Sequence, residues 1–377
     1  MDRMHDPRVL RLPHPIRVDT AAQQHAEVDM FKSAGVWDAL RPYLNDPTKS
    51  SEWLINCAEG MKAVVLRYLE LAGDDNMGSF MLMLIRSRLR AQGDPILQVT
   101  PALQSLLEKT DVNKGLPVGF FRSPFTNVYI EFARPNAYRV SNWMSGLHEL
   151  EGAYVGSYDL APHHCIHQDI RAQRLRLDPN KPTRAIEVVF TGSPEGKQHA
   201  LDDASHDLMM FVQDEDENLA EVLDRHIAFF RSPEAREHSI GITPIPEAEA
   251  ERMTAIIHQL SKVLLYVNLS EAQQIKVNER SDLERKLRKL GKLNATRRDR
   301  LAVTYDRIVV GPTEMPENAR PRAATGTRKK PHWRCGHFRK LRYGQGLQQS
   351  RLVWIQPVLV NADDLLSDVQ PKEYSLH

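Results

Sequence analysis

The densest group of chemically active side chains lies near the C-terminal end of the sequence, between residues 331 and 361. The run reads PHWRCGHFRKLRYGQGLQQSRLVWIQPVLVN and combines histidine, cysteine, arginine, lysine, aromatic residues and glycine. It lies within a window from Asn318 to Ala362 that contains neither aspartate nor glutamate. A basic, aromatic segment without local carboxylates can bind an anionic partner, or it can fold back onto an acidic surface of the same chain.

Nucleic-acid binding is the chemistry that these residue types favour most. Arginine and lysine neutralise phosphates, and aromatic rings stack on unpaired bases. The alternation of a strand would place Arg339 and Tyr343 on the face opposite Phe338, so one face can bind while the other packs. We expect the contact positions to be Arg334, His337, Arg339, Arg342, Tyr343, His332, Trp333, Lys329 and Lys330.

The glycines and the apolar second half of the run predict a β-hairpin. Because glycine adopts a positive φ without steric cost, the GQG triplet indicates a turn between two strands rather than a phosphate-binding loop. The segment RLVWIQPVLV then reads as an apolar strand. We expect structural rather than contact roles for Gly336, Gly344, Gly346, Trp354, Pro357 and Asn361.

Two clusters of histidine and cysteine allow a metal site as an alternative. Zinc takes these side chains as tetrahedral ligands, but the usual pairs of cysteines two residues apart are absent from both clusters. Histidines interleaved with arginine fit an anion-binding face equally well, and we predict neither a metal nor a cofactor. The two clusters are His332, Cys335 and His337, and His163, His164, Cys165 and His167.

A group of aspartates leaves open a metal-dependent nuclease. Carboxylates can hold a divalent ion, but they also form solvated faces and cap helices. The sequence contains neither a P-loop nor a complete dinucleotide-binding fingerprint, and it does not establish a catalytic triad. It therefore favours a binding or regulatory protein over an enzyme. The aspartates are Asp202, Asp203, Asp207, Asp214 and Asp216, with His206 among them.

The net charge of +1 conceals a division of the chain into a basic and an acidic part. Residues 280–353 carry 20 lysines and arginines against 6 aspartates and glutamates, a net +14, so the remainder carries −13. This favours RNA, DNA or an acidic surface as a partner. No run of 18 apolar residues and no apolar leader segment is evident, and three widely spaced cysteines do not suggest a disulfide framework. We therefore expect a cytoplasmic protein without a membrane partner.

The periodicity of apolar residues predicts an α+β fold. A helical N-terminal part is followed by a mixed or antiparallel sheet packed by helices, with a basic β-hairpin at the C-terminal end. The segment FTNVYIEFA alternates with period two, and further strand candidates are GAYVGSYDL, TRAIEVVFTG and HDLMMFVQ. Because no clear amphipathic helix separates them, their spacing predicts an antiparallel meander. The predicted regions are 1–20, an irregular N-terminus broken by prolines; 21–110, helical; 111–270, the α+β core; 271–330, a charged connector and linker with one strand; and 331–377, the basic aromatic hairpin module.

The C-terminal run resembles the type V-A anti-CRISPR family number two and its phage, plasmid and bacterial relatives. The shared pattern is an H-x-R-x-G-H run followed by G-x-G and a strand that closes in Q-P-x-x-V-N. Weaker likenesses lie in LPVGFFRSPFTNVYIEF and in the apolar helix QLSKVLLYVNLSEA, in the same order. The resemblance spans residues 116–361. The pattern is carried here by His332, Arg334, Gly336, His337, Gly344, Gly346, Gln356, Pro357, Val360 and Asn361.

This resemblance implies a non-enzymatic inhibitor. Members of the family lower production of the type V effector nuclease, Cas-twelve-a, by recognising its nascent N-terminal peptide during translation, which leads to loss of its mRNA. The implied partners are that peptide, the ribosome or mRNA, and a recruited host ribonuclease. A general RNA- or DNA-binding regulator of mobile-element origin is the alternative that the residues leave open. We expect the body to bind a peptide, for example by strand addition along FTNVYIEFA, and the hairpin to contact RNA.

Overall fold

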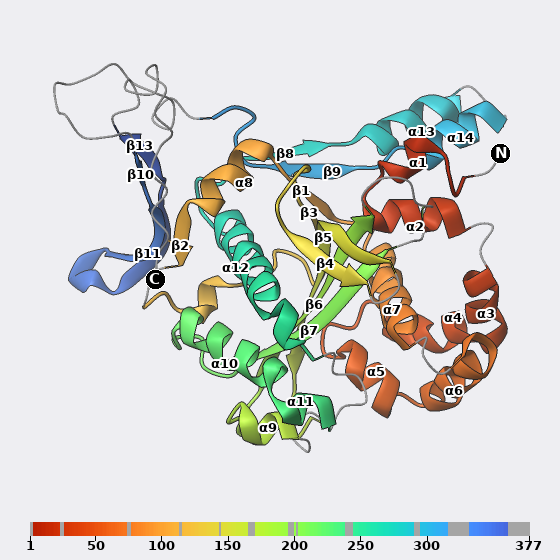
Figure 1. The fold of residues 1–377 in the computed structure, drawn as a ribbon, viewed down its shortest axis with the longest axis horizontal. Coiled ribbons are helices and arrows are strands. Elements are labelled where there is room, and N and C mark those ends of the chain that lie inside the picture. Colours follow the sequence, from red (N-terminus) through yellow and green to blue (C-terminus); the bar gives the residue numbers. More distant parts are fainter. Residues whose placement is uncertain are drawn as a thin grey trace.

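The structure is a computed structural model of the chain. A large mixed sheet forms its centre, with helices on both faces, and a separate hairpin projects from one end (Figure 1). The fold is thus α+β with a helical N-terminal part, as predicted. The structure describes residues 3–22, 26–73, 77–112, 115–142, 145–164, 170–194, 200, 203–237, 244–289, 295–315 and 332–360.

The N-terminal segment is helical, and the prediction that residues 1–20 are irregular is wrong. Helix α1 (Pro7–Leu10) begins with a proline, whose missing N–H costs nothing at the first helical position. The Asp6 carboxylate caps this helix by accepting a hydrogen bond of 2.9 Å from the Arg8 backbone N–H. Pro15 likewise lies in the first turn of α2 (His14–Ala22). The prolines therefore begin helices here and do not prevent them.

The next helices form a small bundle around Phe31, Tyr68 and Phe80, whose rings lie 4.5 to 5.4 Å apart. The region predicted as helical over 21–110 also contains a strand, β1 (Ile96–Val99), that the sequence did not predict. Four residues are too few to display a period, and the strand is buried in the sheet. The helices are α3 (Ala26–Ala34), α4 (Val36–Leu40), α5 (Ser51–Cys57), α6 (Met61–Ala72) and α7 (Met77–Ala91).

The main sheet has the strand order β7-β6-β5-β3-β1-β9-β8, with β4 paired to β5. The predicted antiparallel meander is confirmed in β3, β5, β6 and β7. Beyond β3 the direction changes, because β3, β1 and β9 are mutually parallel and β8 is antiparallel to β9. The bounds of the meander strands and β4 are β3 (Asn127–Glu131), β4 (Arg139–Asn142), β5 (Gly146–Leu160), β6 (Thr183–Pro194) and β7 (Ala204–Val212).

Helices cover both faces of this sheet, and alternation along β5 decides which side chain meets which layer. Ala153 and Val155 belong to the larger core, which also contains residues of α8, α10 and α12. Tyr154 points to the other face, where α1, α2 and α7 pack. Within the described residues, no helix combines the length and apolar character needed to cross a bilayer. The bounds of the helices that follow α7 are α8 (Pro101–Glu108), α9 (Ile170–Arg174), α10 (Leu219–Arg231), α11 (Pro233–Glu237) and α12 (Ala250–Val267).

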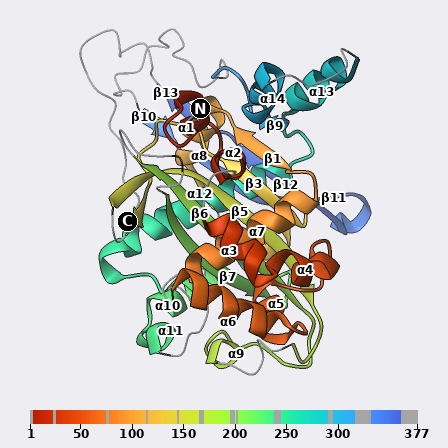
Figure 2. The ribbon, with the colours of Figure 1, turned by 90° about the vertical axis from the view of Figure 1, so that its right-hand side faces the viewer.

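The predicted connector over 271–330 contains two strands, where the sequence predicted one. Strands β8 (Gln274–Val277) and β9 (Arg307–Val310) complete the main sheet, and helices α13 (Glu279–Lys289) and α14 (Ala295–Ala302) lie between them. The two helices project from the body beside α1 (Figure 2). The short strand QIKV was missed because its residues are mostly exposed and polar on one side. The proposed linker over 316–330 lies outside the described residues.

The C-terminal hairpin is formed by β11 (Gly336–Tyr343) and β12 (Gln349–Ile355), as predicted. Its first strand pairs in parallel with β2 (Thr110–Val112), and a separate pair is made by β10 (His332–Arg334) and β13 (Val358–Val360). The hairpin extends away from the body in Figure 1. Only its base is therefore held by the rest of the fold.

Candidate functional site

The base of the hairpin belongs to the core of the protein. The rings of Phe338 and Trp354 are stacked with centroids 5.8 Å apart, and Trp354 meets Tyr266 of α12 edge-on at 5.4 Å. The indole Nε1–H donates a hydrogen bond of 3.2 Å to the Thr110 hydroxyl. Trp354 thus anchors the hairpin to both β2 and α12, so the segment is not an independently packed module.

The opposite face of the hairpin is open to solvent and combines cations with an aromatic ring. Arg339, Tyr343 and Arg351 lie on this face, because Tyr343 pairs with Gln349 and Arg339 with Val353 in the antiparallel register. The Arg351 guanidinium lies 5.9 Å from the centre of the Tyr343 ring, which is 43% exposed. We call these three residues the hairpin face. Arg342 is also exposed, but alternation places it on the side of Phe338.

The glycines of the run occupy positions where a side chain would not fit or would be strained. A Cβ atom on Gly336 would lie 2.7 Å from the Ile355 carbonyl oxygen and 2.7 Å from Pro357 Cδ. Gly344 and Gly346 have φ angles of 79° and 66° in the turn between the strands. Pro357 is buried. The hairpin therefore depends on these residues for its backbone geometry.

The remaining predicted contact residues lie at the base of the hairpin. His332 and Trp333 pair through their backbones with Val360 and Leu359. Arg334 and Cys335 are exposed, and His337 is half-buried beside β2. Lys340, on the packed side, forms an ion pair of 3.5 Å with Asp216 of the acidic body. Lys329, Lys330 and Asn361 lie outside the described residues.

The structure does not gather the aspartates into one site. The Asp203 side chain is 10% exposed, and its carboxylate pairs with Arg17 and with His14 at 3.3 Å. Asp214 and Asp216 follow the far end of β7, which begins just after Asp203. Among the described residues, no three His, Cys, Asp or Glu side chains lie close enough together to hold a metal ion. Asp202, Cys165 and His167 lie outside those residues.

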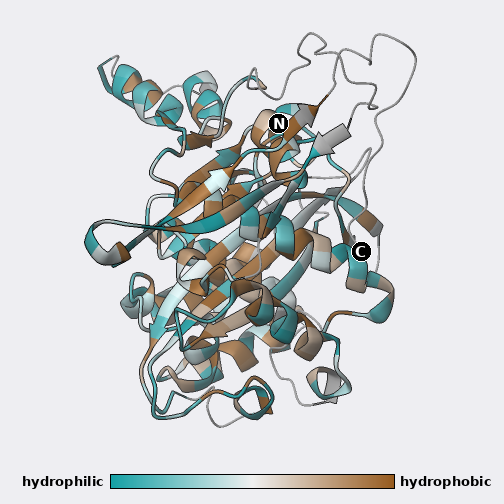
Figure 3. Cartoon of the chain, turned by 90° about the vertical axis from the view of Figure 1, so that its left-hand side faces the viewer, coloured by the Kyte–Doolittle hydropathy of each residue, from teal (hydrophilic) through white to brown (hydrophobic). Residues whose placement is uncertain are grey.

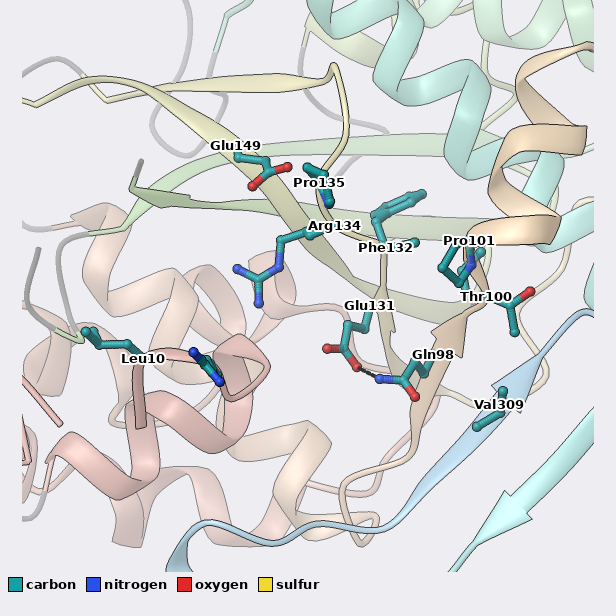
Figure 4. Close-up of a pocket in the computed structure, with 13 residues that line it drawn as sticks. Leu10, Gln98, Thr100, Pro101, Glu131, Phe132, Arg134, Pro135, Glu149 and Val309 are labelled. Carbon is teal, nitrogen blue, oxygen red and sulfur yellow. Dashed lines mark hydrogen bonds between the residues drawn. The ribbon is translucent and has the colours of Figure 1, made fainter. Parts of the chain in front are cut away.

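A cavity of about 720 Å³ opens at the carboxyl ends of the parallel strands β1 and β3 (Figure 4). The edge where parallel strands end is a common position for ligand sites in mixed sheets. A second hollow of about 810 Å³ adjoins it and shares Pro101 and residues 133–135. The first cavity is lined by Leu10, Arg11, Gln98, Val99, Thr100, Pro101, Glu131, Phe132, Ala133, Arg134, Pro135, Glu149 and Val309.

The cavity carries charges of both signs. Arg134 extends into its centre, and the Glu131 carboxylate points toward the same space (Figure 4). Glu149 accepts a hydrogen bond of 2.6 Å from the Asn136 backbone N–H, which leaves capacity on its second oxygen. Within the described part of the chain, no ion pair within 4.0 Å joins Arg11 or Arg134 to a carboxylate, and the charge of Arg134 acts on Glu131 only in opposing the rise of its pKa. These two guanidinium groups are available for a ligand.

Glu131 is the cavity carboxyl whose pKa is shifted into the neutral range. Burial raises the pKa of its carboxyl from 4.5 to about 7, and the charge of Glu151 adds to this effect. Gln98 Nε2 donates to it at 3.0 Å, and the Tyr305 hydroxyl donates at 3.4 Å. A group with this pKa changes its charge near neutral pH. Perturbed groups of this kind are frequent at binding sites.

Sequence reasoning did not identify these cavity residues. Arg11, Gln98, Glu131, Glu149 and Val309 are far apart in the chain, and only the strand topology brings them together. One signal was present, because Glu131 is a carboxylate at the end of an otherwise mostly apolar strand. Without the sheet order, this residue could not be distinguished from an ordinary solvent-facing position.

Comparison with known proteins identifies the family. The model of the Anti-CRISPR type V subtype A2 family (AcrVA2-like) matches residues 97–362, from β1 to beyond β13. The crystal structure of AcrVA2 is similar to this chain with a TM-score of 0.45 and 14% sequence identity, over 91% of this chain and 97% of that one. No curated protein matches. Since the family model covers most of the sequence, this chain belongs to the anti-CRISPR type V subtype A2 family.

Proposed function

We propose that this anti-CRISPR protein recognises the nascent N-terminal peptide of a target, the type V effector nuclease, and thereby causes loss of the mRNA that encodes it. Family membership supports the inhibitory role. The observation that carries the peptide-binding step is the pair of adjoining hollows on either side of residues 133–135, with Arg11 and Arg134 available in the first. In this proposal the protein is a cytoplasmic regulator that acts on translation and is not itself an enzyme.

The cavity suits a short peptide better than the strand edge first considered. Strand β3, which contains NVYIE, is paired to β5 on one side and to β1 on the other, so it has no free edge for another strand. The hollows instead offer carboxylates and guanidinium groups around an apolar floor that includes Phe132 and Val99. A peptide of mixed charge can satisfy both signs while burying its apolar side chains.

The hairpin face supplies the second half of the proposal. Arg339, Arg351 and Tyr343 combine phosphate-binding cations with a ring that can stack on an unpaired base. In this division of labour the hairpin face contacts mRNA, the ribosome or a recruited ribonuclease. Deleting residues 318–377 is not a clean test, because it would also remove Phe338 and Trp354 from the core.

Substitutions on the two surfaces test the division. Titration calorimetry with a synthetic N-terminal peptide of the effector nuclease should show at least a tenfold loss of affinity in the R11A/R134A double variant. The variant R339A/Y343A/R351A should keep peptide affinity and abolish transcript loss in cells that express the nuclease. Arg67→Ala, on an exposed turn of α6, is the matched control. If the hairpin variant lost peptide affinity to the same extent as it lost the ability to reduce the transcript, the division would be contradicted.

A general nucleic-acid-binding regulator is the second candidate, and the exposed cations of the hairpin favour it. It predicts RNA or DNA affinity that falls steeply with salt and does not depend on the peptide. The nuclease alternative predicts metal-dependent cleavage by the purified protein. Asp203→Ala is a poor test of that alternative because Asp203 neutralises the buried Arg17. Asp207→Ala leaves that ion pair intact and is the better choice.

A further inference from the structure

A second basic surface lies on α13 and α14, far from the hairpin along the long axis of the molecule (Figure 1). The two helices are fixed to the body. The Thr20 hydroxyl of α2 donates a hydrogen bond of 2.8 Å to the Ala302 carbonyl oxygen at the end of α14, and Arg307 of β9 pairs with Glu279 of α13 at 3.0 Å. Leu287 is only 7% exposed. We call α13 and α14 together the basic helix pair.

The helix pair has more cations than its own carboxylates can neutralise. Each of its four acidic side chains already has an arginine partner. These ion pairs are Glu279–Arg307, Asp282–Arg285, Glu284–Arg280 and Asp299–Arg8. Five exposed cations remain that, within the described residues, have no carboxylate at ion-pair distance: Lys286, Arg288, Lys289, Arg298 and Arg300.

Helix stability alone does not account for this charge. The C-terminal end of a helix favours cations, which explains Lys286, Arg288 and Lys289 in the last turns of α13. Arg298, however, lies in the first turn of α14, where the helix dipole opposes positive charge. Its position carries an electrostatic cost within the protein that an anionic partner would relieve.

The composition of the helix pair decides which anionic partner fits. Neither helix contains an aromatic residue, so the pair cannot stack on unpaired bases. Its three leucines are not exposed, since Leu283 and Leu301 are half-buried and Leu287 is buried, so the pair lacks the exposed apolar anchors of a protein interface or of a membrane-surface helix. In Figure 3 the pair is largely hydrophilic, in contrast to the central strands. Closely spaced phosphates are the partner that such a surface can recognise.

We propose that the basic helix pair binds the phosphate backbone of double-helical RNA. The pair and the hairpin lie toward the same side of the molecule in Figures 2 and 3 but at opposite ends of its long axis in Figure 1, so an RNA that contacts both must extend along that axis. Phosphate contact follows from the charges and from the absence of aromatic residues. The choice of RNA over DNA rests on the proposed function. The hairpin face, which contains Tyr343, then contacts unpaired nucleotides, and the helix pair contacts the duplex.

The test measures binding of the full chain to a blunt-ended RNA duplex of about 20 base pairs, long enough to span two successive minor grooves, at several salt concentrations. The variant R288Q/K289Q/R298Q/R300Q should bind at least tenfold more weakly at about 100 mM salt, and the slope of log K against log salt should fall by about 0.9 for each phosphate that the variant no longer neutralises. A charge-matched control, K32Q/K62Q/R67Q/K181Q, removes four exposed cations elsewhere and should bind like the wild type. The variant R288K/R298K/R300K, which keeps the charge, should also retain binding.

The outcomes separate this proposal from the proposed function. Unchanged affinity and slope in the quadruple variant would overturn the phosphate site, and so would an equal loss in the control. Equal affinity for a DNA duplex of the same sequence would overturn the assignment to RNA. Peptide affinity, measured on the same preparations, reports on the cavity alone. A failure of the proposed function would therefore appear as absent peptide binding, whereas a failure of the phosphate site would appear as unchanged duplex affinity in the quadruple variant. Far-ultraviolet circular dichroism of each variant establishes that the fold is retained.

Discussion

Arg17 and Glu151 face each other in the interior of the protein, joined by two hydrogen bonds of 2.5 and 2.8 Å from the two terminal guanidinium nitrogens. Arg17 belongs to α2 and Glu151 to β5, so the pair joins the N-terminal helices to the centre of the sheet. The same guanidinium also pairs with Asp203. Arg17 Nη1 also donates a hydrogen bond of 3.1 Å to the Leu12 carbonyl oxygen, so the same side chain holds the segment next to Leu10 and Arg11, which line the cavity.

Removing one partner of this buried pair should destabilise the protein strongly. Arg17→Leu leaves the carboxylates of Glu151 and Asp203 without their cation, and we expect a loss of about 3–5 kcal/mol in the free energy of unfolding. Urea denaturation measures it. Arg41→Leu is the matched control, because the Arg41–Asp38 pair is exposed and should contribute less than about 1 kcal/mol. Similar losses in both variants would contradict a structural role for the buried pair.

A second buried carboxyl should make stability depend on pH. Burial raises the pKa of Glu187 from 4.5 to about 7, while the Ser51 hydroxyl donates to it at 2.6 Å and the charge of Arg88 opposes the shift. Because the pKa of Glu187 is higher in the folded than in the unfolded state, its protonated form stabilises the fold. This contribution is complete below pH 4.5 and is lost as the pH rises through 7. Glu187→Gln should therefore gain stability relative to the wild type between about pH 5 and pH 8, by up to about 3 kcal/mol.

Urea unfolding of the wild type and of Glu187→Gln, at about pH 5 and about pH 8, measures this change in the free energy of unfolding. Any cost of the substitution that does not depend on pH cancels when the two differences are compared. A variant whose offset from the wild type is the same at both pH values would show that Glu187 does not titrate in this range.

The two faces of the hairpin should respond differently to truncation. Trp354→Ala removes a ring that packs on Phe338 and Tyr266, and a loss of about 3–5 kcal/mol is expected. Tyr343→Ala removes an exposed ring and should change stability by less than about 0.5 kcal/mol. Thermal unfolding of the two variants measures this contrast. A large loss from Tyr343→Ala would place that ring in the packed core and would contradict its assignment to the hairpin face.

Local patterns were sufficient to predict the fold class, the meander and the C-terminal hairpin. The reason is physical: a half-buried antiparallel strand alternates with period two, and β7 is long enough to show it, whereas the middle of β5 is buried on both faces. The prolines near the N-terminus were misinterpreted as helix breakers. Their effect depends on whether they lie in the first turn of a helix or within it, and the Asp6 cap decides this for Pro7.

The cavity could not be predicted because it is a product of topology. Gln98 and Glu131 are neighbours only because β1 pairs in parallel with β3, and nothing local to either residue encodes that pairing. The charge of the connector was visible in the sequence as an excess of basic residues. Which of those cations on α13 and α14 remain without a carboxylate depends on contacts such as Asp299 with Arg8, which join distant parts of the chain.

Peptide binding to the cavity should depend on pH through Glu131. Because its pKa is about 7, the carboxyl gains its charge between about pH 6 and pH 8. An ionised carboxylate accepts stronger hydrogen bonds from peptide N–H groups than a neutral carboxyl does. We therefore expect the dissociation constant for the effector peptide to fall several-fold over this range, and Glu131→Gln to remove the dependence.

The matched control for this measurement is Glu187→Gln, which removes a carboxyl of similar pKa that lies outside the cavity. It should preserve the pH dependence of peptide affinity while it alters the pH dependence of stability. Glu131→Gln should flatten the pH dependence of peptide affinity. If both variants flatten the pH dependence of peptide affinity, that dependence arises from the stability of the whole fold, and Glu131 would not lie in contact with the peptide. If neither does, Glu131 is not the source of the pH dependence, and its predicted contact with the peptide is contradicted.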